Sequence, residues 1–399
     1  MKYYISIISI LFFATSILCA QNQSTNAGVS LSPEQTFSRE QIIKHFENAT
    51  DKKNLSLKGG VKYEGQAKGK KPNGYGKAVY PNGDTYLGEF VRGVRQGNGV
   101  YTYKDGERYE GAFLDDRQHG KGTLYFNDGR VYSGFWQADY QHGYGQMKYP
   151  NGDYYVGMWS EDERNGSGSY VYANGATYSG EWKDDKYNGV GTFIWRDNSK
   201  YVGEWRNGQR HGQGTFYYSN GDVYKGGWAG DVRNGQGVYT FAADTCVYSG
   251  GFVNGSWHGY GVYSTPDGVA YEGHFAGGMR NGSGKMYYEG GACYSGEWKD
   301  NMRHGKGTYT WANGDVYEGE WSGDNMNGTG IMRFANGMKY RGGFLDGEEH
   351  GTGVAVDVDG TRYEGTFEGG MRHGKFVVKD GSGKVIRECV YNLGTISNK

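Results

Sequence analysis

The sequence predicts an all-β protein, built from tandem β-hairpins of antiparallel strands. Glycine contributes 73 of 399 residues and proline only 5. Tyr, Phe and Trp contribute 37, 17 and 10 residues. Helices tolerate glycine poorly, whereas tight turns require it and strands favour aromatic side chains. The third observation is a tyrosine that recurs about every 23 residues between positions 60 and 385.

The composition also excludes several classes of protein. Glycine is abundant without a strict three-residue period, which excludes collagen. The aromatic content argues against a disordered chain. Lys and Arg (43) balance Asp and Glu (44), so the formal charge is −1. A nucleic-acid partner would require a basic face, and we therefore expect none.

Residues 1–20 have the layout of a secretory signal peptide. Lys2 precedes an apolar run that ends in small residues at Ala20, and polar residues follow. The run is short for a membrane span. We expect cleavage after Ala20 and export to the periplasm, the cell surface or the medium, with an uncleaved anchor as the alternative.

Three cysteines remain after such cleavage, namely Cys246, Cys293 and Cys389. This odd and sparse set does not form a disulfide framework. The exported chain must therefore hold together without disulfide bonds.

Residues 21–59 are polar and read as a linker that contains one short helix. Ser38 and Gln41 form a capping box, and Ile42, Ile43 and Phe46 would share one face of a helix near residues 39–48. This helix either caps the first edge of the sheet or belongs to the linker.

Residues 60–385 contain one repeat fourteen times, and internal repeats of this length indicate a repeat architecture. We count positions from the tyrosine of each repeat as position 0. Phe or Trp stands at position +4 in every repeat except the first, which has Ala67, and glycines stand at +11 and +13. A turn dipeptide stands at +19 and +20. The position-0 residues are Tyr63, Tyr86, Tyr109, Tyr132, Tyr155, Tyr178, Tyr201, Tyr224, Tyr248, Tyr271, Tyr294, Tyr317, Tyr340 and Tyr363.

The turn dipeptide predicts one hairpin per repeat. Asn-Gly and Asp-Gly, as in Asn82-Gly83, favour a type I′ turn, in which both central residues have positive φ. The strand before the turn would run as in 191–195 and the strand after it as in 201–205. Because side chains alternate between faces, the position-0 Tyr, the glycine at +2 and the ring at +4 share one face. The other face carries Glu, Ser, Lys, Thr and Val.

An aromatic face on a single sheet requires cover. The sequence supplies no second sheet or set of helices, so the rings must pack against one another across the sheet. The glycine between Tyr and Trp leaves room for a ring to lie over bare backbone. Stacked repeats then bury what one repeat cannot.

Repeats such as Tyr178-Ser-Gly-Glu-Trp182, followed by Asn188-Gly-Val-Gly191, resemble MORN (membrane occupation and recognition nexus) repeats. The resemblance covers all fourteen repeats. It implies an elongated, twisted, single-layer antiparallel sheet and roles in scaffolding, in tethering at membranes and in dimerisation. The first repeat (Ala67) and the last (Phe376, Asp380) depart from the pattern, as does Asp357 at a position that is aromatic in eleven other repeats.

The aromatic face is the best candidate site. Stacked rings could hold a sugar, a peptide or a lipid headgroup, or they could be the core of the sheet. The candidate residues are Tyr178, Trp182, Phe193, Trp195, Tyr201, Trp205 and Trp228.

No pattern predicts catalysis, a cofactor or a metal, so we expect that the chain is not an enzyme. The Gly-x-Gly pairs open strands rather than helices, which argues against phosphate binding. Seven histidines share position +10 with Asn and Gln, which indicates hydrogen bonding rather than acid–base chemistry. A row of glutamates at +3, such as Glu181 and Glu204, lies on the face opposite the rings. Arginines in the loops alternate with aspartates, which does not favour anionic lipid.

Two segments interrupt the pattern. The repeat that starts at Tyr224 has one extra residue within 241–247, which is either a tolerated insertion or a bulge that bends the sheet. Residues 386–399 form a C-terminal tail, and Val385–Val390 read as one more strand. This strand either closes the edge of the sheet or pairs with a second chain in a homodimer, where Cys389 could also bond between chains.

The sequence therefore predicts an exported, non-catalytic scaffold that binds another protein at or outside the membrane. The alternative is direct binding of membrane lipid or envelope glycan through the aromatic face. The identity of the partner does not follow from the sequence, because every repeat satisfies the same packing demands first.

Overall fold

The computed structural model describes residues 38–397, so the expected signal peptide at 1–20 lies outside the described residues. The chain forms two compact bodies. The N-terminal body contains residues up to 125 together with 136–139, and the C-terminal body contains 126–135 and the chain from 140 onward.

In the N-terminal body one helix and a short 3₁₀ turn accompany seven strands. Their bounds are α2 (Arg39–Glu47), β1 (Lys52–Ser56), η1 (Lys58–Gly60), β2 (Lys62–Lys68), β3 (Lys71–Val79), β4 (Thr85–Val91), β5 (Val94–Thr102), β6 (Arg108–Leu114) and β7 (Arg117–Tyr125). Strand β8 (Val131–Gln137) contributes residues to both bodies.

The C-terminal body continues with strands and one more 3₁₀ turn. They are β9 (Tyr140–Lys148), β10 (Tyr154–Ser160), β11 (Glu163–Val171), β12 (Thr177–Lys183), β13 (Lys186–Ile194), β14 (Lys200–Arg206), β15 (Gln209–Tyr217), β16 (Val223–Ala229), β17 (Val232–Thr240), β18 (Val247–Val253), β19 (Ser256–Thr265), β20 (Gly268–Ala276), β21 (Met279–Tyr287), η2 (Glu289–Gly291), β22 (Cys293–Lys299), β23 (Met302–Thr310), β24 (Val316–Ser322), β25 (Asn325–Arg333), β26 (Lys339–Leu345), β27 (Glu348–Val356), β28 (Arg362–Glu368), β29 (Met371–Lys379), β30 (Val385–Asn392) and β31 (Thr395–Ile396).

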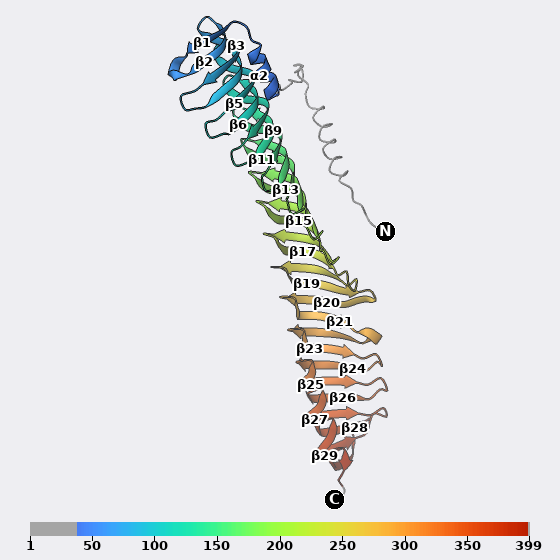
Figure 1. Cartoon of the computed structure of the whole chain (residues 1–399). Coiled ribbons are helices and arrows are strands. Elements are labelled where there is room, and N and C mark those ends of the chain that lie inside the picture. The colour runs from blue at the N-terminus through green and yellow to red at the C-terminus, as the bar shows by residue number, and fades with distance from the viewer. Residues whose placement is uncertain (1–37, 398–399) are drawn as a thin grey trace, which may run out of the picture. The chain divides into compact units, whose positions relative to one another are not determined.

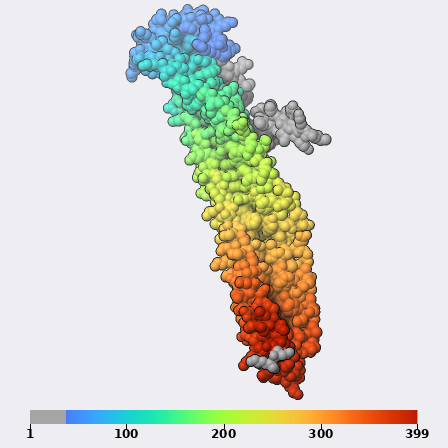
Figure 2. Space-filling model, turned by 60° about the horizontal axis from the view of Figure 1, so that its bottom comes forward, coloured from blue at the N-terminus to red at the C-terminus, as the bar shows by residue number. Residues whose placement is uncertain are grey.

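The strands belong to one antiparallel sheet of 31 strands, as the sequence predicts. Within the C-terminal body each strand pairs with the next one in sequence, for example β13 with β14 and β14 with β15. Figure 1 shows the strands from β11 to β29 side by side in chain order. In Figure 2 the colours of this body follow one another without interleaving, so its contacts join neighbours in sequence.

Helix α2 has the predicted capping box, since the Ser38 side chain accepts from the Gln41 backbone and the Gln41 side chain from the Ser38 backbone. Ile42 is fully buried and the helix contacts β3, β4 and β5. The helix therefore packs on the sheet. It does not cap the edge of the sheet, because the edge strand is β1, which pairs only with β2 within residues 38–397. It is not a free part of a linker either, because it contacts β3, β4 and β5.

The type I′ turns lie at the opposite end of the hairpins from the predicted one. At Asn82-Gly83 only Gly83 has positive φ (97°), and its amide donates to the Tyr80 carbonyl at 3.0 Å. This is a type I turn followed by a left-handed glycine. The two-residue turns with positive φ at both positions occupy +6 and +7, as in Asp184 (49°) and Asp185 (63°). Aspartate tolerates this region. Other repeats place glycine at +6 or +7, as in Asn207-Gly208 and Asp346-Gly347.

The structure also shows the two segments that interrupt the repeat pattern, 241–247 and 385–392. The extra residue at 241–247 is held in a longer loop, in which the Phe241 amide donates to the Cys246 carbonyl at 2.9 Å. The strands on both sides keep their register, since Thr240 pairs with Val247, so the insertion is not a bulge within a strand. Residues 385–392 form the predicted extra strand, β30, which pairs with β29. Among residues 38–397 no helix is long and apolar enough to cross a bilayer.

Candidate binding surface

The tyrosine at position 0 forms the floor of the aromatic face. Tyr201 is fully buried, and its hydroxyl donates to the Glu204 carbonyl at 3.0 Å. Its ring lies over two paired glycines, Gly203 and Gly214. A Cβ at Gly214 would lie 2.5 Å from the ring carbon Cζ of Tyr201, so only glycine fits there. The predicted packing of a ring over bare backbone is confirmed.

The ring at position +4 joins one repeat to the previous one. Trp205 is 6% exposed and meets Tyr201 edge to face at 5.1 Å and Tyr178 of the previous repeat at 5.6 Å. Its indole Nε1 donates to the Gly191 carbonyl at 3.2 Å. Each such ring therefore contacts two tyrosines, and the edge-to-face geometry adds about 0.5–1.5 kcal/mol per pair to the energy of burial.

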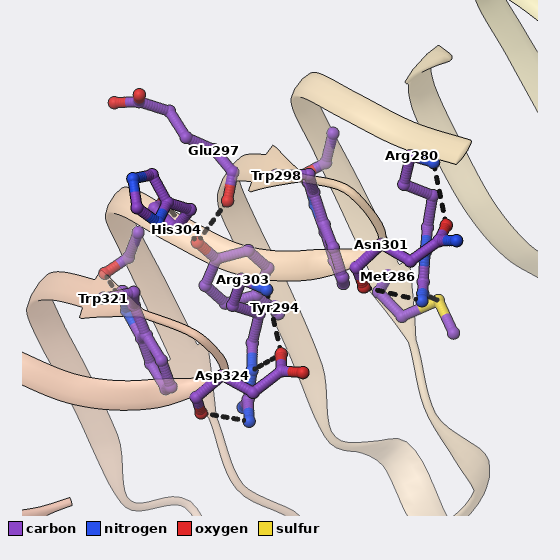
Figure 3. A network of polar contacts seen from close by, with 12 residues as sticks. Arg280, Met286, Tyr294, Glu297, Trp298, Asn301, Arg303, His304, Trp321 and Asp324 are labelled. Carbon is purple, nitrogen blue, oxygen red and sulfur yellow. Dashed lines mark hydrogen bonds and ion pairs between the residues drawn. The ribbon is translucent and has the colours of Figure 1, made fainter. Parts of the chain in front are cut away.

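The residue at position +9 makes the second connection between repeats. Figure 3 shows Arg303 lying beside Trp321, with its guanidinium directed at Asp324 of the next repeat. Arg303 Nε donates to Asp324 Oδ1 at 3.1 Å and the other guanidinium nitrogen to the Asp324 carbonyl at 2.7 Å. The guanidinium carbon lies 4.4 Å from the centre of the Trp321 ring. Burial against the ring and the carboxylate satisfies the charge of the arginine within the sheet.

Positions +9 and +7 vary together along the chain. An Asp or Asn stands at +7 in seven repeats, and in all seven the preceding +9 residue is Arg or Gln, whose backbone amide donates to the +7 side chain at 2.7–3.1 Å. Where +9 is Tyr187, Trp257, Met326 or Glu349, the following +7 residue is glycine. Two arginines, Arg233 and Arg372, also face glycine. Comparing the repeats at these two positions would have revealed this coupling from the sequence.

The glutamates at position +3 are structural. Glu204 Oε1 accepts from the Gln213 amide at 2.8 Å, and Glu89 Oε1 accepts from the Asn98 amide at 2.9 Å. These amides lie beside the register shift that follows Gly203 or Gly88, where the partner strand cannot satisfy them. The carboxylates therefore complete the hydrogen bonding of the bulge and are not paired for glycoside hydrolysis.

Aspartates before the tyrosines join the hairpin loops to the next repeat. Asp222 Oδ2 accepts from the Tyr239 hydroxyl at 2.7 Å, and Oδ1 from the Ala242 amide at 2.8 Å. These hydrogen bonds lower the pKa of Asp222, so its carboxylate is ionised. Burial, in contrast, raises the pKa of the core hydroxyl of Tyr317 to about 12, so this hydroxyl stays protonated as a donor.

A continuous row of rings crosses the aromatic face between β9 and β18. Neighbouring ring centres in this row are 4.4–5.9 Å apart. We call it the aromatic ladder; its members occupy positions +15 and +17 and are Tyr149, Tyr170, Tyr172, Phe193, Trp195, Phe216, Tyr218, Tyr239 and Phe241.

The structure divides the seven candidate aromatics into two groups. Five of them are 0–6% exposed and form the floor and the connections of the sheet, namely Tyr178, Trp182, Tyr201, Trp205 and Trp228. Burial favours the core interpretation for these five, because a ligand could reach them only if the repeats separated. Phe193 and Trp195 remain half-buried and belong to the aromatic ladder.

The histidines and cysteines of residues 38–397 belong to no metal-binding cluster. Within residues 38–397 no three His, Cys, Asp or Glu side chains are close enough to share a metal ion. Cys246, Cys293 and Cys389 are free thiols.

The chain belongs to the MORN repeat family, because the family model matches fourteen consecutive segments. The matched segments are 63–85, 86–108, 109–129, 132–154, 155–177, 178–200, 201–223, 224–245, 248–269, 271–293, 294–316, 317–339, 340–362 and 363–375. Such repeats form binding scaffolds, and this chain is a repeat-based scaffold of that kind. No curated protein sequence matches the chain.

Several solved structures align weakly. The TCP domain of SAS-4 (dCPAP) from Drosophila melanogaster, in complex with a proline-rich motif of Ana2, aligns with a TM-score of 0.25 and 15% identity over 50% of this chain and 97% of that domain. The TCP10 domain of CPAP from Danio rerio, in complex with a STIL peptide, aligns with a TM-score of 0.20 and 12% identity over 67% of this chain and 97% of that domain. Virginiamycin B lyase from Staphylococcus aureus aligns with a TM-score of 0.12 and 14% identity over 70% of this chain and 89% of the lyase. These scores carry no inference about function.

Proposed function

We propose that this protein is an exported, non-catalytic scaffold that binds another protein at or outside the membrane. The observation that carries the proposal is that the polar groups common to the repeats are already hydrogen-bonded within the sheet. The tyrosine hydroxyls, the glutamates at +3 and most arginines at +9 are bonded to backbone or to neighbouring repeats. What remains available for recognition is an extended surface of side chains that differ from repeat to repeat, which suits a protein partner better than a small substrate.

The face opposite the rings supports the same proposal. In the middle of the C-terminal body it exposes apolar side chains, including Val190 at 59% and Tyr260 at 56%. Exposed apolar residues on a regular sheet suit contact with another protein.

Direct binding of lipid or glycan is the second candidate. Phe193 and Trp195 of the aromatic ladder would favour glycan, since half-buried rings can stack on sugars. Anionic lipid is less favoured, because several of the arginines at position +9 are paired with carboxylates. Arg164, Arg210 and Arg303 each lie within 2.6–3.1 Å of a carboxylate oxygen.

Site-specific photo-crosslinking in the native host tests the proposal. A crosslinking residue at Val190 or Tyr260 should give one discrete protein adduct, which mass spectrometry identifies. The matched control position is Val358, an exposed apolar residue (69%) in a hairpin loop at the C-terminal end of the repeats. Adducts with lipid or glycan only, at every position, would contradict the proposal.

Export is tested on the same preparation. N-terminal sequencing of the mature protein should begin at Gln21. A cytosolic protein that retains Met1 would contradict export.

A further inference from the structure

We infer that the aromatic ladder is a docking surface for a basic, proline-rich segment of a partner protein in the polyproline II conformation. The inference rests on the proposed scaffold function and names the chemical class of its partner. Three observations carry it: which rings of the ladder are accessible, the distance at which they recur, and the charge of the loops beside them.

The accessible rings stand at position +17. Three of the four rings at +15 have an arginine guanidinium over them, namely Tyr170, Phe216 and Tyr239. Arg210, for example, lies 5.2 Å from the centre of the Phe216 ring. The fourth, Phe193, packs against the Tyr187 ring instead. The rings at +17 remain half-buried; in the middle of the ladder they are Tyr172, Trp195, Tyr218 and Phe241. The guanidinium of Arg210 lies farther from the Trp195 ring, at 6.0 Å, than from the Phe216 ring.

The spacing of these rings matches a polyproline II helix. They recur once per repeat, and a repeat contributes two strands, so successive rings lie about 9.5 Å apart across the sheet. A polyproline II helix advances about 3.1 Å per residue with three residues per turn, which gives about 9.3 Å per turn. A segment that crosses the strands therefore presents the same edge to each successive ring. Aromatic surfaces recognise this conformation because it is already ordered and loses little entropy on binding.

The charge of the neighbouring loops selects a basic segment. The loops between repeats that border the ladder contain Asp153, Asp197, Asp222 and Asp244 but only one cation, Arg196. Hydrogen bonds with Ser199 lower the pKa of Asp197, and bonds from Tyr239 and Ala242 lower that of Asp222, so both carry charge at neutral pH. Along the other side of the ladder, Arg164 and Arg210 are already paired with aspartates, whereas Arg233 donates to the Gly255 carbonyl at 2.8 Å. An arginine or lysine at every third position of the segment would lie against the acidic loops.

The test is fluorescence anisotropy with the mature chain and a labelled (Arg-Pro-Pro)₄ peptide. We expect it to bind at least about tenfold more tightly than (Arg-Gly-Gly)₄, which lacks the conformation, or (Glu-Pro-Pro)₄, which lacks the charge. Equal binding of the glycine peptide would overturn the inference, because charge alone would explain it. Binding of cellohexaose without binding of (Arg-Pro-Pro)₄ would also overturn it, in favour of a glycan ligand.

Two variants locate the site. Trp195→Ala should weaken peptide binding by about tenfold, whereas Trp311→Ala should change it less than twofold. Trp311 is the matched control because it occupies the same repeat position outside the ladder and contacts Tyr309 in the same way, at 4.6 Å. Equal loss in both variants would overturn the inference.

A second pair of variants guards against misfolding. The first is the double variant Asp197→Asn, Asp244→Asn. Its asparagine side chains keep the oxygens that accept from the Ser199 and Cys246 amides at 3.0 Å, so only the charge is lost. Binding of (Arg-Pro-Pro)₄ should weaken about threefold or more, whereas Asp359→Asn, in an equivalent turn outside the ladder, should not change it. Unchanged binding in the double variant would overturn the choice of a basic segment. If no peptide binds while Val190 still crosslinks to a protein, this inference fails and the scaffold function stands.

Discussion

The coupling between positions +9 and +7 predicts the outcome of a double-mutant cycle at Arg210 and Asp231. Arg210 Nε lies 3.0 Å from Asp231 Oδ1, and its guanidinium carbon lies 4.5 Å from the centre of the Trp228 ring. The side chains are 20% and 43% exposed, so the ion pair contributes at the low end of about 0.2–1 kcal/mol. The contact with the ring adds about 0.5–1 kcal/mol. Arg210→Met should therefore cost about 0.7–1.5 kcal/mol.

The second change should partly restore the stability. Asp231 has a φ of 68°, which costs a residue other than glycine up to about 1 kcal/mol. In the presence of Arg210 this strain is offset by the bonds to its carboxylate. In Arg210→Met the carboxylate loses the bond from Nε and keeps only the bond from the backbone amide of residue 210, so Asp231→Gly should then recover up to about 1 kcal/mol. The double variant reproduces the combination Met326 and Gly347, which the chain already contains.

Native-state hydrogen exchange of the amides in β15 and β16 measures these free energies locally. The midpoint of global thermal or denaturant unfolding would be less informative, because a repeat array need not unfold in one step. We expect a coupling free energy of about 1 kcal/mol between the two sites. A coupling below about 0.3 kcal/mol would show that the two positions are independent and would refute the reasoning.

Three further predictions concern the core and its titration. Gly214→Ala should cost about 3 kcal/mol or more, because its methyl group would overlap the Tyr201 ring. Gly208→Ala has open space around it and only the strain of a positive φ (85°), so it should cost clearly less; thermal melts followed by circular dichroism compare the two. Trp205→Ala should cost about 3–5 kcal/mol by the same assay, and a variant that kept full stability would show that this ring is not core. Burial raises the pKa of Glu349 to about 7, so between its unfolded value and 7 the folded chain binds more protons than the unfolded chain and stability falls as the pH rises. Urea midpoints at pH 5 and pH 8 should show this fall in the native chain and its reduction in Glu349→Gln; an equal fall in both would contradict the assignment.

The period of the repeat was sufficient to predict the architecture, because period and fold depend on the same residues. Tyr201 needs the bare backbone at Gly203 and Gly214, so the spacing of tyrosine and glycine directly reports the contact. The alternation of faces followed from the strand pattern, and the pairing of β13 with β14 confirms it.

The turn type was mispredicted because two turns compete in each repeat. Asn-Gly is the stronger sequence signal, and it was assigned the two-residue turn. The structure uses Gly83 in a longer loop and places the two-residue turn at +6 and +7, where some repeats have two aspartates, as at Asp184, and others have Asn-Gly, as at Asn207-Gly208. Local sequence does not report which loop length the register of the paired strands requires.

The candidate site was predicted in part for a related reason. The sequence shows that Trp195 and Trp205 lie on one face, but only the packing of neighbouring repeats decides that Trp205 is covered while Trp195 is partly accessible. The pairing of Arg210 with Asp231 joins two repeats and is invisible when each repeat is considered alone.

The link between positions +9 and +7 also restricts how such a chain can change its length. A tandem duplication or deletion joins two repeats that were not neighbours before. If Met326 came to precede Asp231, the aspartate would keep its positive φ but lose its guanidinium partner. Recombination that exchanges whole segments between matching junctions avoids this mismatch. Protein engineers who wish to shorten or extend the array should therefore choose junctions that keep each +9 residue next to its original +7 partner in the following repeat.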